Sequence, residues 1–71
     1  MVNGAIVLFI GTVSIEELLS LALYKTKNIY EAEELVQETL LTTLIYINKG
    51  NEIKDYKSYL ITILNGKYND M

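Results

Sequence analysis

The sequence has no cysteine, histidine, arginine or proline among its 71 residues. Without cysteine, neither a disulfide nor a thiolate metal site can support a domain this small. Without histidine, the commonest general base and metal ligand is missing, and no glycine-rich phosphate loop is present. We therefore expect a binding module rather than an enzyme, with no metal site and no cofactor.

The charge balance is acidic, because nine Asp and Glu residues against six lysines give a net charge of −3. Affinity for phosphates rests on clustered cationic side chains, and here the lysines are scattered along the chain. We therefore expect that any contact with nucleic acid depends on a larger assembly.

Apolar residues make up 51% of this short chain. A domain of this size buries only a modest core, so it keeps surplus apolar surface that a partner or a second copy can cover. We therefore expect the isolated chain to form a homodimer or a larger homo-oligomer.

The lack of proline and of any long alternating run predicts an all-α fold, a small three-helix domain over residues 14–71. Ser14 and Glu17 form a capping box for a first helix over residues 15–25. Asn28 ends that helix and caps a central helix, which runs to about Asn48, and Gly50 ends the central helix.

Asp55 caps a third helix that is expected to continue to the end of the chain. Its apolar side chains recur at helical spacing and form a stripe of Tyr56, Tyr59, Leu60, Ile63, Leu64 and Tyr68.

Residues 1–13 form an N-terminal extension, expected to be irregular or a short strand. Its apolar run, Ala5–Ile10, is too short to span a bilayer and lacks the features of a secretory signal. Two interpretations stand: a segment that binds a partner or a second copy, and a packed extension with no function of its own. We expect a cytoplasmic protein with no membrane partner.

The central helix has two different faces at about 100° per residue. The face predicted to enter the core comprises Ala32, Leu35, Val36, Thr39, Leu40, Thr43 and Ile47. The opposite face comprises Glu34, Gln37, Glu38, Leu41 and Ile45. An ordinary solvated face seldom ends in two large aliphatic side chains, which favours a docking surface.

The string Ala32–Leu41, AEELVQETLL, resembles conserved region 2 of bacterial RNA polymerase sigma factors, particularly the extracytoplasmic-function type. The resemblance continues in Leu23–Asn28, similar to the end of that domain's preceding helix, and in Ile53–Asn65, similar to its following helix. It covers most of the chain, from Ile15 to Met71, but not the N-terminal extension.

The resemblance implies that the central helix docks on the clamp coiled coil of the polymerase β′ subunit. The positions that match the family's docking residues are Glu34, Gln37 and Glu38, with Leu41 beside them. Carboxylates and an amide suit basic side chains through charge-assisted hydrogen bonds, and an aliphatic side chain supplies an apolar centre.

The resemblance also implies contact with the non-template strand of minus-ten promoter DNA. Such contact needs cationic groups along the backbone and pockets for bases. The matching residues are Lys49, Asn51, Lys54, Lys57, Asn65 and Lys67. Tyr56 and Tyr59 also lie in this stretch, but their place on the apolar stripe favours a role in the core.

Two departures from the family weaken the expectation of promoter contact. The sequence has no arginine near Asn65, and it contains no second domain for the minus-thirty-five element. The alternative is therefore a small self-associating helical interaction or regulatory protein that does not bind DNA.

Overall fold

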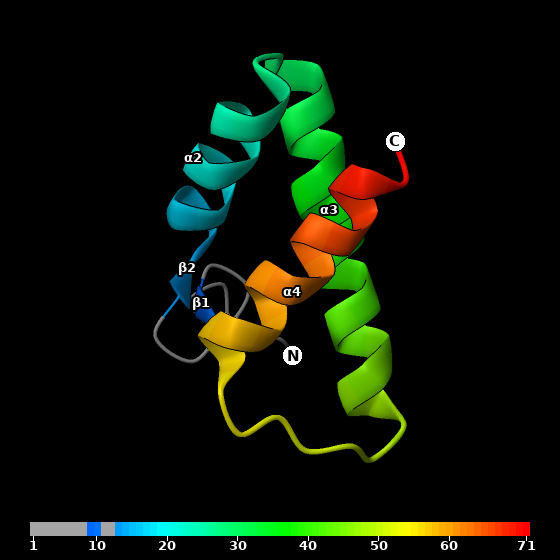
Figure 1. The fold of residues 1–71 in the computed structure, drawn as a ribbon. Coiled ribbons are helices and arrows are strands. Elements are labelled where there is room, and N and C mark those ends of the chain that lie inside the picture. The colour runs from blue at the N-terminus through cyan, green and yellow to red at the C-terminus, as the bar shows by residue number, and fades with distance from the viewer. Residues whose placement is uncertain (1–8, 11–12) are drawn as a thin grey trace.

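The computed structural model describes residues 9–10 and 13–71, and most of these belong to three helices (Figure 1). The helices are α2 (Ile15–Thr26), α3 (Ile29–Asn48) and α4 (Tyr56–Asn69). The prediction of an all-α, three-helix domain is confirmed. The predicted limits of the first two helices agree with the structure to within a residue, but α4 ends at Asn69 and does not continue to Met71.

A short antiparallel pair of strands precedes α2. Strand β1 (Phe9–Ile10) pairs with β2 (Val13–Ser14), with Phe9 opposite Ser14 and Ile10 opposite Val13. The rest of the predicted N-terminal extension, including most of the Ala5–Ile10 run, lies outside the described residues.

Side-chain caps fix where α2 and α3 begin. The Ser14 hydroxyl accepts a hydrogen bond from the backbone N–H of Glu17 at 3.2 Å. The Asn28 carboxamide oxygen accepts from the N–H groups of Tyr30 at 2.9 Å and Glu31 at 3.1 Å. These bonds satisfy N–H groups that have no partner within the helix, which is why both predicted start sites are correct.

The two helix ends use left-handed backbone in different ways. After α2, Lys27 takes the left-handed conformation with φ 57°, and its N–H bonds the Leu23 carbonyl at 2.8 Å. The break between the helices therefore lies at Lys27, one residue before the predicted Asn28. After α3, Gly50 has φ 93° and its N–H bonds the Ile47 carbonyl, as its sequence position predicts.

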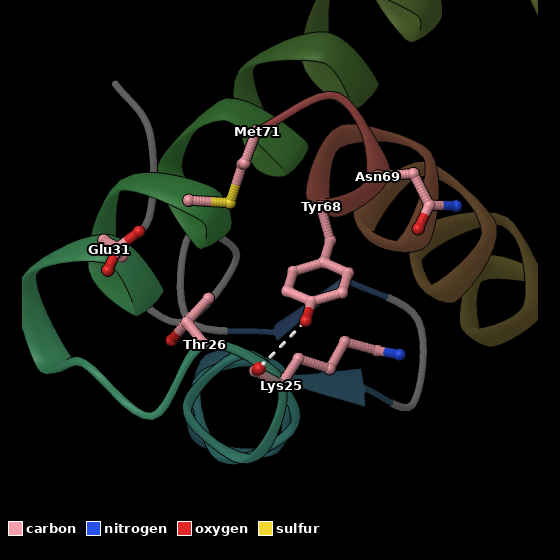
Figure 2. A pocket seen from close by; sticks show the side chains of 6 residues that line it. All are labelled: Lys25, Thr26, Glu31, Tyr68, Asn69 and Met71. Carbon is pink, nitrogen blue, oxygen red and sulfur yellow. Dashed lines mark hydrogen bonds between the residues drawn. The ribbon is translucent and has the colours of Figure 1, made fainter.

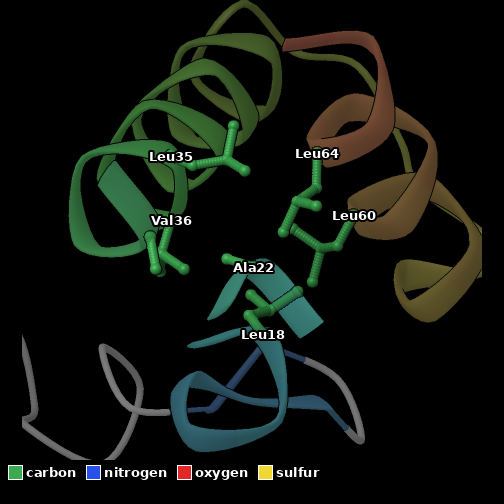
Figure 3. Close-up of a cluster of buried hydrophobic side chains, with 7 residues drawn as sticks. Leu18, Ala22, Leu35, Val36, Leu60 and Leu64 are labelled. Carbon is green, nitrogen blue, oxygen red and sulfur yellow. The ribbon is translucent and has the colours of Figure 1, made fainter. Parts of the chain in front are cut away.

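The core lies where the three helices meet, and Figure 3 shows aliphatic side chains from all three pointing toward one another. α3 packs against both α2 and α4. The fully buried apolar residues are Leu18 and Ala22 from α2, Ala32, Leu35 and Val36 from α3, and Leu60 and Leu64 from α4.

Two threonines complete the buried face of α3. Thr39 and Thr43 are both 0% exposed, and each hydroxyl donates to the carbonyl four residues earlier, Leu35 and Thr39 respectively, at 2.8 Å. Each buried hydroxyl is therefore satisfied within its own helix. Leu40 and Ile47, also predicted for this face, are half-buried at its edge.

Candidate docking face on α3

α3 is the longest helix, and its outer face is the candidate site. An α-helix of 20 residues is about 30 Å long, comparable with the longest dimension of the molecule, 33 Å. α2 and α4 cover one side of α3 (Figure 1), and among the described residues most side chains on the opposite side are exposed.

The structure places all four predicted polymerase-binding residues on this outer face. Glu34, Gln37, Glu38 and Leu41 are all exposed. Taking the buried Ala32 as the origin, Leu41 lies about 180° around the helix and Glu34 about 200° around it. Two carboxylates, one amide and one aliphatic side chain therefore share a surface that the fold itself does not use.

The outer face changes character along the helix. In the first half of the helix, residues 29–38, this face carries Glu34 and Glu38, whereas Thr39–Asn48 contains no charged residue. In this second half Leu41 is 59% exposed, Leu44 56% and Ile45 48%. These three large aliphatic side chains therefore lie close together on the surface, which makes this half of the helix a candidate for interaction.

Leu44 is a member of this surface that the sequence reasoning missed. It lies about 120° from Ala32, at the edge between the two faces, so helical spacing alone does not assign it. A sequence signal was the pair Thr39 and Thr43 on the predicted core face, because inward threonines one turn apart place Leu44 toward the edge of that face.

A groove of about 280 Å³ lies beside these leucines. Its lining residues are Leu44, Ile45, Ile47 and Asn48, at the C-terminal end of α3. Leu41 stands one turn before it on the same helix. The outer face thus presents an exposed aliphatic side chain, and a shallow apolar hollow lies beside it at the C-terminal end of α3, extending toward the half-buried Ile47.

The predicted DNA-binding residues do not form one patch. Lys49, Asn51 and Lys54 lie between α3 and α4, and Lys57 lies in the first turn of α4; all four are exposed. The Asn51 amide donates to the Tyr46 carbonyl at 3.0 Å, so it also serves as a cap for the end of α3.

Asn65 and Lys67 lie in the C-terminal half of α4, away from the other four. Both are half-buried, and their positions differ by about 200° around the helix axis. The Asn65 side-chain oxygen is buried without a hydrogen-bond partner among the described residues. These two residues therefore do not extend the loop lysines into a continuous track.

The two tyrosines in this region take part in packing. Tyr56 and Tyr59 are half-buried, and the ring of Tyr59 stacks on Tyr46 with centroids 5.2 Å apart and planes 27° apart. This contact joins α3 to α4 across the loop between them. It agrees with the interpretation of Tyr59 as a packing residue.

Asp55 organises the start of α4 next to the loop lysines. Its carboxylate accepts from the Ser58 N–H at 3.1 Å and from the Ser58 hydroxyl at 2.9 Å. These hydrogen bonds, the backbone one first, lower the pKa of Asp55 below its ordinary value of 3.8. The role of this carboxylate is to cap a helix.

A separate polar pocket of about 370 Å³ lies between the C-terminal ends of α2 and α4 (Figure 2). There the Tyr68 hydroxyl donates to the Lys25 carbonyl at 3.1 Å, and the Lys25 ammonium lies 5.4 Å from the Tyr68 ring centroid. This pair ties the two helix ends together. None of the predicted site residues lines this pocket.

Among residues 9–10 and 13–71 there is no cluster of metal-ligating side chains. In the same part of the chain, no helix has the length and apolar character needed to cross a membrane. No family model, curated protein or solved structure matches this chain. What supports a function is the exposed face of α3 and the residue string that forms it.

Proposed function

We propose that this chain is a transcription-initiation module of the sigma region 2 type, which docks on the clamp coiled coil of RNA polymerase β′ through the outer face of α3. The observation that supports it is the common exposure of Glu34, Gln37, Glu38 and Leu41 on the side of α3 turned away from the core. These are the positions that the sequence string matches to the family's docking residues.

The chemistry of the face suits a basic partner helix. Glu34 and Glu38 are one turn apart, so a lysine or arginine can bridge or fork between them. Gln37 adds an amide that both donates and accepts. Leu41 becomes buried when the partner docks and supplies the apolar anchor from which interface energy usually comes. The carboxylates surround it as a polar rim.

The proposal includes a secondary contact with the non-template strand of the minus-ten element through Lys49, Asn51, Lys54 and Lys57. Three exposed lysines and one asparagine around one loop supply groups that can meet phosphates, although Glu52 and Asp55 in the same loop offset part of the positive charge. The contact is weak on its own, because the chain has net charge −3 and no arginine. It operates once the polymerase holds the module beside the DNA.

The test is co-purification of the chain with core polymerase and with an isolated β′ clamp coiled coil. The variant Glu34→Lys/Glu38→Lys reverses both carboxylates, and we expect it to reduce clamp binding by about a hundredfold, since each charged contact becomes repulsive. The matched control is Glu33→Lys/Glu52→Lys, which changes net charge equally at exposed positions off the docking face. Equal binding by both variants would contradict the proposal.

The DNA contact has its own test. Binding of the chain–polymerase complex to a single-stranded minus-ten oligonucleotide should weaken as salt rises, with a smaller salt slope for Lys54→Gln/Lys57→Gln. Lys27→Gln, near the opposite end of α3, is the control. An unchanged slope in the double variant would remove the DNA contact while leaving clamp docking in place.

A second candidate function is a self-associating helical interaction protein that does not bind DNA. The exposure of Leu41, Leu44 and Ile45 favours it, because folding leaves these side chains uncovered. A chain that self-associates but does not co-purify with core polymerase or its clamp would establish this second function over the first.

A further inference from the structure

We infer that the outer face of α3 pairs with the same face of a second copy of this chain, with the two α3 helices antiparallel. Spacing gives the first reason. Glu34, Glu38, Leu41, Ile45 and Asn48 follow one another at intervals of four, three, four and three residues. That alternation averages 3.5 residues and places Leu41 and Ile45 as apolar neighbours in the middle of one narrow stripe, the arrangement by which two helices pack, with polar side chains at both ends.

Shape gives the second reason. In such packing, a side chain of one helix enters a hole formed by positions i, i+3, i+4 and i+7 of the other. Leu41, Leu44, Ile45 and Asn48 have this spacing, and three of them line the 280 Å³ groove. Leu41 is 59% exposed and fits this hollow in the partner.

Charge gives the third reason and selects the direction. In a parallel pair, Glu34 and Glu38 of one copy would face Glu34 and Glu38 of the other, which is repulsive. In an antiparallel pair centred on residue 43, Leu41 faces Ile45 of the second copy. Glu38 then meets Asn48 and Lys49, an amide donor and a cation, at both ends of the seam.

The pair is expected to be weak. One helical seam per copy is well below the roughly 800 Å² per partner of a standard stable interface, so dissociation near 100 µM is the expected scale. Glu34 lies past the end of the partner helix, where Gly50 turns the chain away, and adds little. The inferred pairing of two copies does not depend on the proposed function. Only its consequence, that the pair hides Glu38 and Leu41 from the clamp, rests on that function.

The first experiment is sedimentation equilibrium of the full chain from about 10 µM to about 1 mM, a range around the expected dissociation constant. Glu38→Lys and Lys49→Glu should each raise the dissociation constant by about three- to tenfold, and the double variant should restore it, because the swap rebuilds both symmetric pairs. Glu33→Lys and Lys57→Glu, exposed but off the seam, are the matched controls.

A monomer at the highest concentration would overturn the inference. So would a dimer that responds equally to seam and control variants, since it would use another surface. Circular dichroism of each variant separates loss of pairing from loss of folding. Ile45→Glu places a charge in the apolar centre of both copies and should raise the dissociation constant by about a hundredfold while leaving the helical signal unchanged.

The second experiment tests direction by cross-linking, and the absence of native cysteine makes each introduced thiol unique. In the antiparallel pair, residue 38 of one copy lies next to residue 48 of the other, whereas the two residues 38 are about 15 Å apart along the axis. That separation is too long for a disulfide. Glu38→Cys chains mixed with Asn48→Cys chains should therefore form mixed disulfide dimers.

Cross-linking of Glu38→Cys chains to one another in preference to mixed dimers would show a parallel pair and overturn the inference. Clamp binding is measured separately on the same samples. If the chain pairs as described but does not bind the clamp, only the proposed function is contradicted. If the chain binds the clamp but does not pair, only the inferred pairing is contradicted.

Discussion

The two halves of α3 differ in which side chains they bury and which they expose. In residues 29–38 the buried side is aliphatic, with Ala32, Leu35 and Val36 in the core, and glutamates face solvent. In residues 39–48 the buried positions are Thr39 and Thr43, and the aliphatic side chains of Leu41, Leu44 and Ile45 face outward. Along one continuous helix, the outward-facing side chains therefore change from charged to aliphatic near the middle, while Leu40 and Ile47 remain half-buried in the second half.

This change along the helix separates side chains that stabilise the fold from large aliphatic side chains that stay exposed. Buried threonines cost little in the second half, because each hydroxyl bonds to a carbonyl of its own helix. The exposed aliphatic side chains gain less from folding than core residues do, since about half of their surface stays in water. The first half thus supplies most of the aliphatic core of α3, whereas the second half keeps Leu41, Leu44 and Ile45 exposed and contributes to packing through Thr39, Thr43 and Leu40.

The sharpest way to break this comparison is to truncate one leucine in each half. Leu35→Ala should lower the free energy of unfolding by about 2–5 kcal/mol, enough to unfold much of a domain this small. Leu41→Ala should change it by less than about 0.5 kcal/mol. Urea denaturation followed by circular dichroism, at a concentration below dimer formation, measures both. Similar losses in the two variants would show that both halves support the fold.

Glycine substitutions sharpen the comparison by changing stability away from the outer face. Gly66→Ala should stabilise α4 by about 1 kcal/mol, because a methyl group there meets no atom within 4 Å. Gly50→Ala should destabilise by about 1 kcal/mol, since φ 93° disfavours any residue with a Cβ atom. Thermal melts of the two variants should move in opposite directions. Gly66→Ala can also serve as a more stable parent protein into which the charge-reversal variants are introduced.

Replacing a buried threonine tests whether its hydroxyl group contributes to the stability of the second half of α3. Thr43→Val should raise the free energy of unfolding by up to about 1 kcal/mol, because the Thr39 carbonyl keeps its helical N–H partner and the added methyl is buried. The exposed Thr62→Val is the matched control and should change it by less than about 0.5 kcal/mol. A large decrease in the free energy of unfolding of Thr43→Val would mean that the hydroxyl group stabilises the fold beyond its own hydrogen bond to the Thr39 carbonyl.

The smallest expected effect concerns the Asp55 cap, which supports α4 against α3 and leaves the outer face untouched. Its folded pKa lies below the ordinary 3.8, so its stabilising contribution is complete above that pH and is lost as pH falls through the folded pKa. Asp55→Ala should therefore lower the melting temperature equally at pH 7 and pH 5. The difference between the variant and the native chain should shrink below about pH 4. A constant difference down to pH 2 would contradict this.

Much of the fold could be predicted because local chemistry decides it. Ser14, Asn28 and Asp55 cap helices where their side chains suggested, and the 3.6-residue period identified the buried side of α3. The exposed polar members of the candidate face followed from the same period. Whether that face binds polymerase stays a prediction, because exposure is necessary for docking and does not identify a partner.

What the sequence did not reveal depends on contacts between distant segments. Lys27 takes a left-handed conformation that residue type alone favours for glycine or asparagine. Leu44 sits at the boundary of two faces, where only the packing of α2 and α4 decides which side is covered. The stacking of Tyr46 on Tyr59 depends on the path of the loop between α3 and α4.

That stacked pair gives the protein a built-in optical reporter. The chain has six tyrosines, one phenylalanine and no tryptophan, so tyrosine dominates its near-ultraviolet signal. Two rings with centroids 5.2 Å apart couple electronically and quench one another, and any movement of α4 away from the end of α3 restores emission. Tyr46 lies next to Ile45 on α3, so events at the outer face can be followed by fluorescence without attaching a dye.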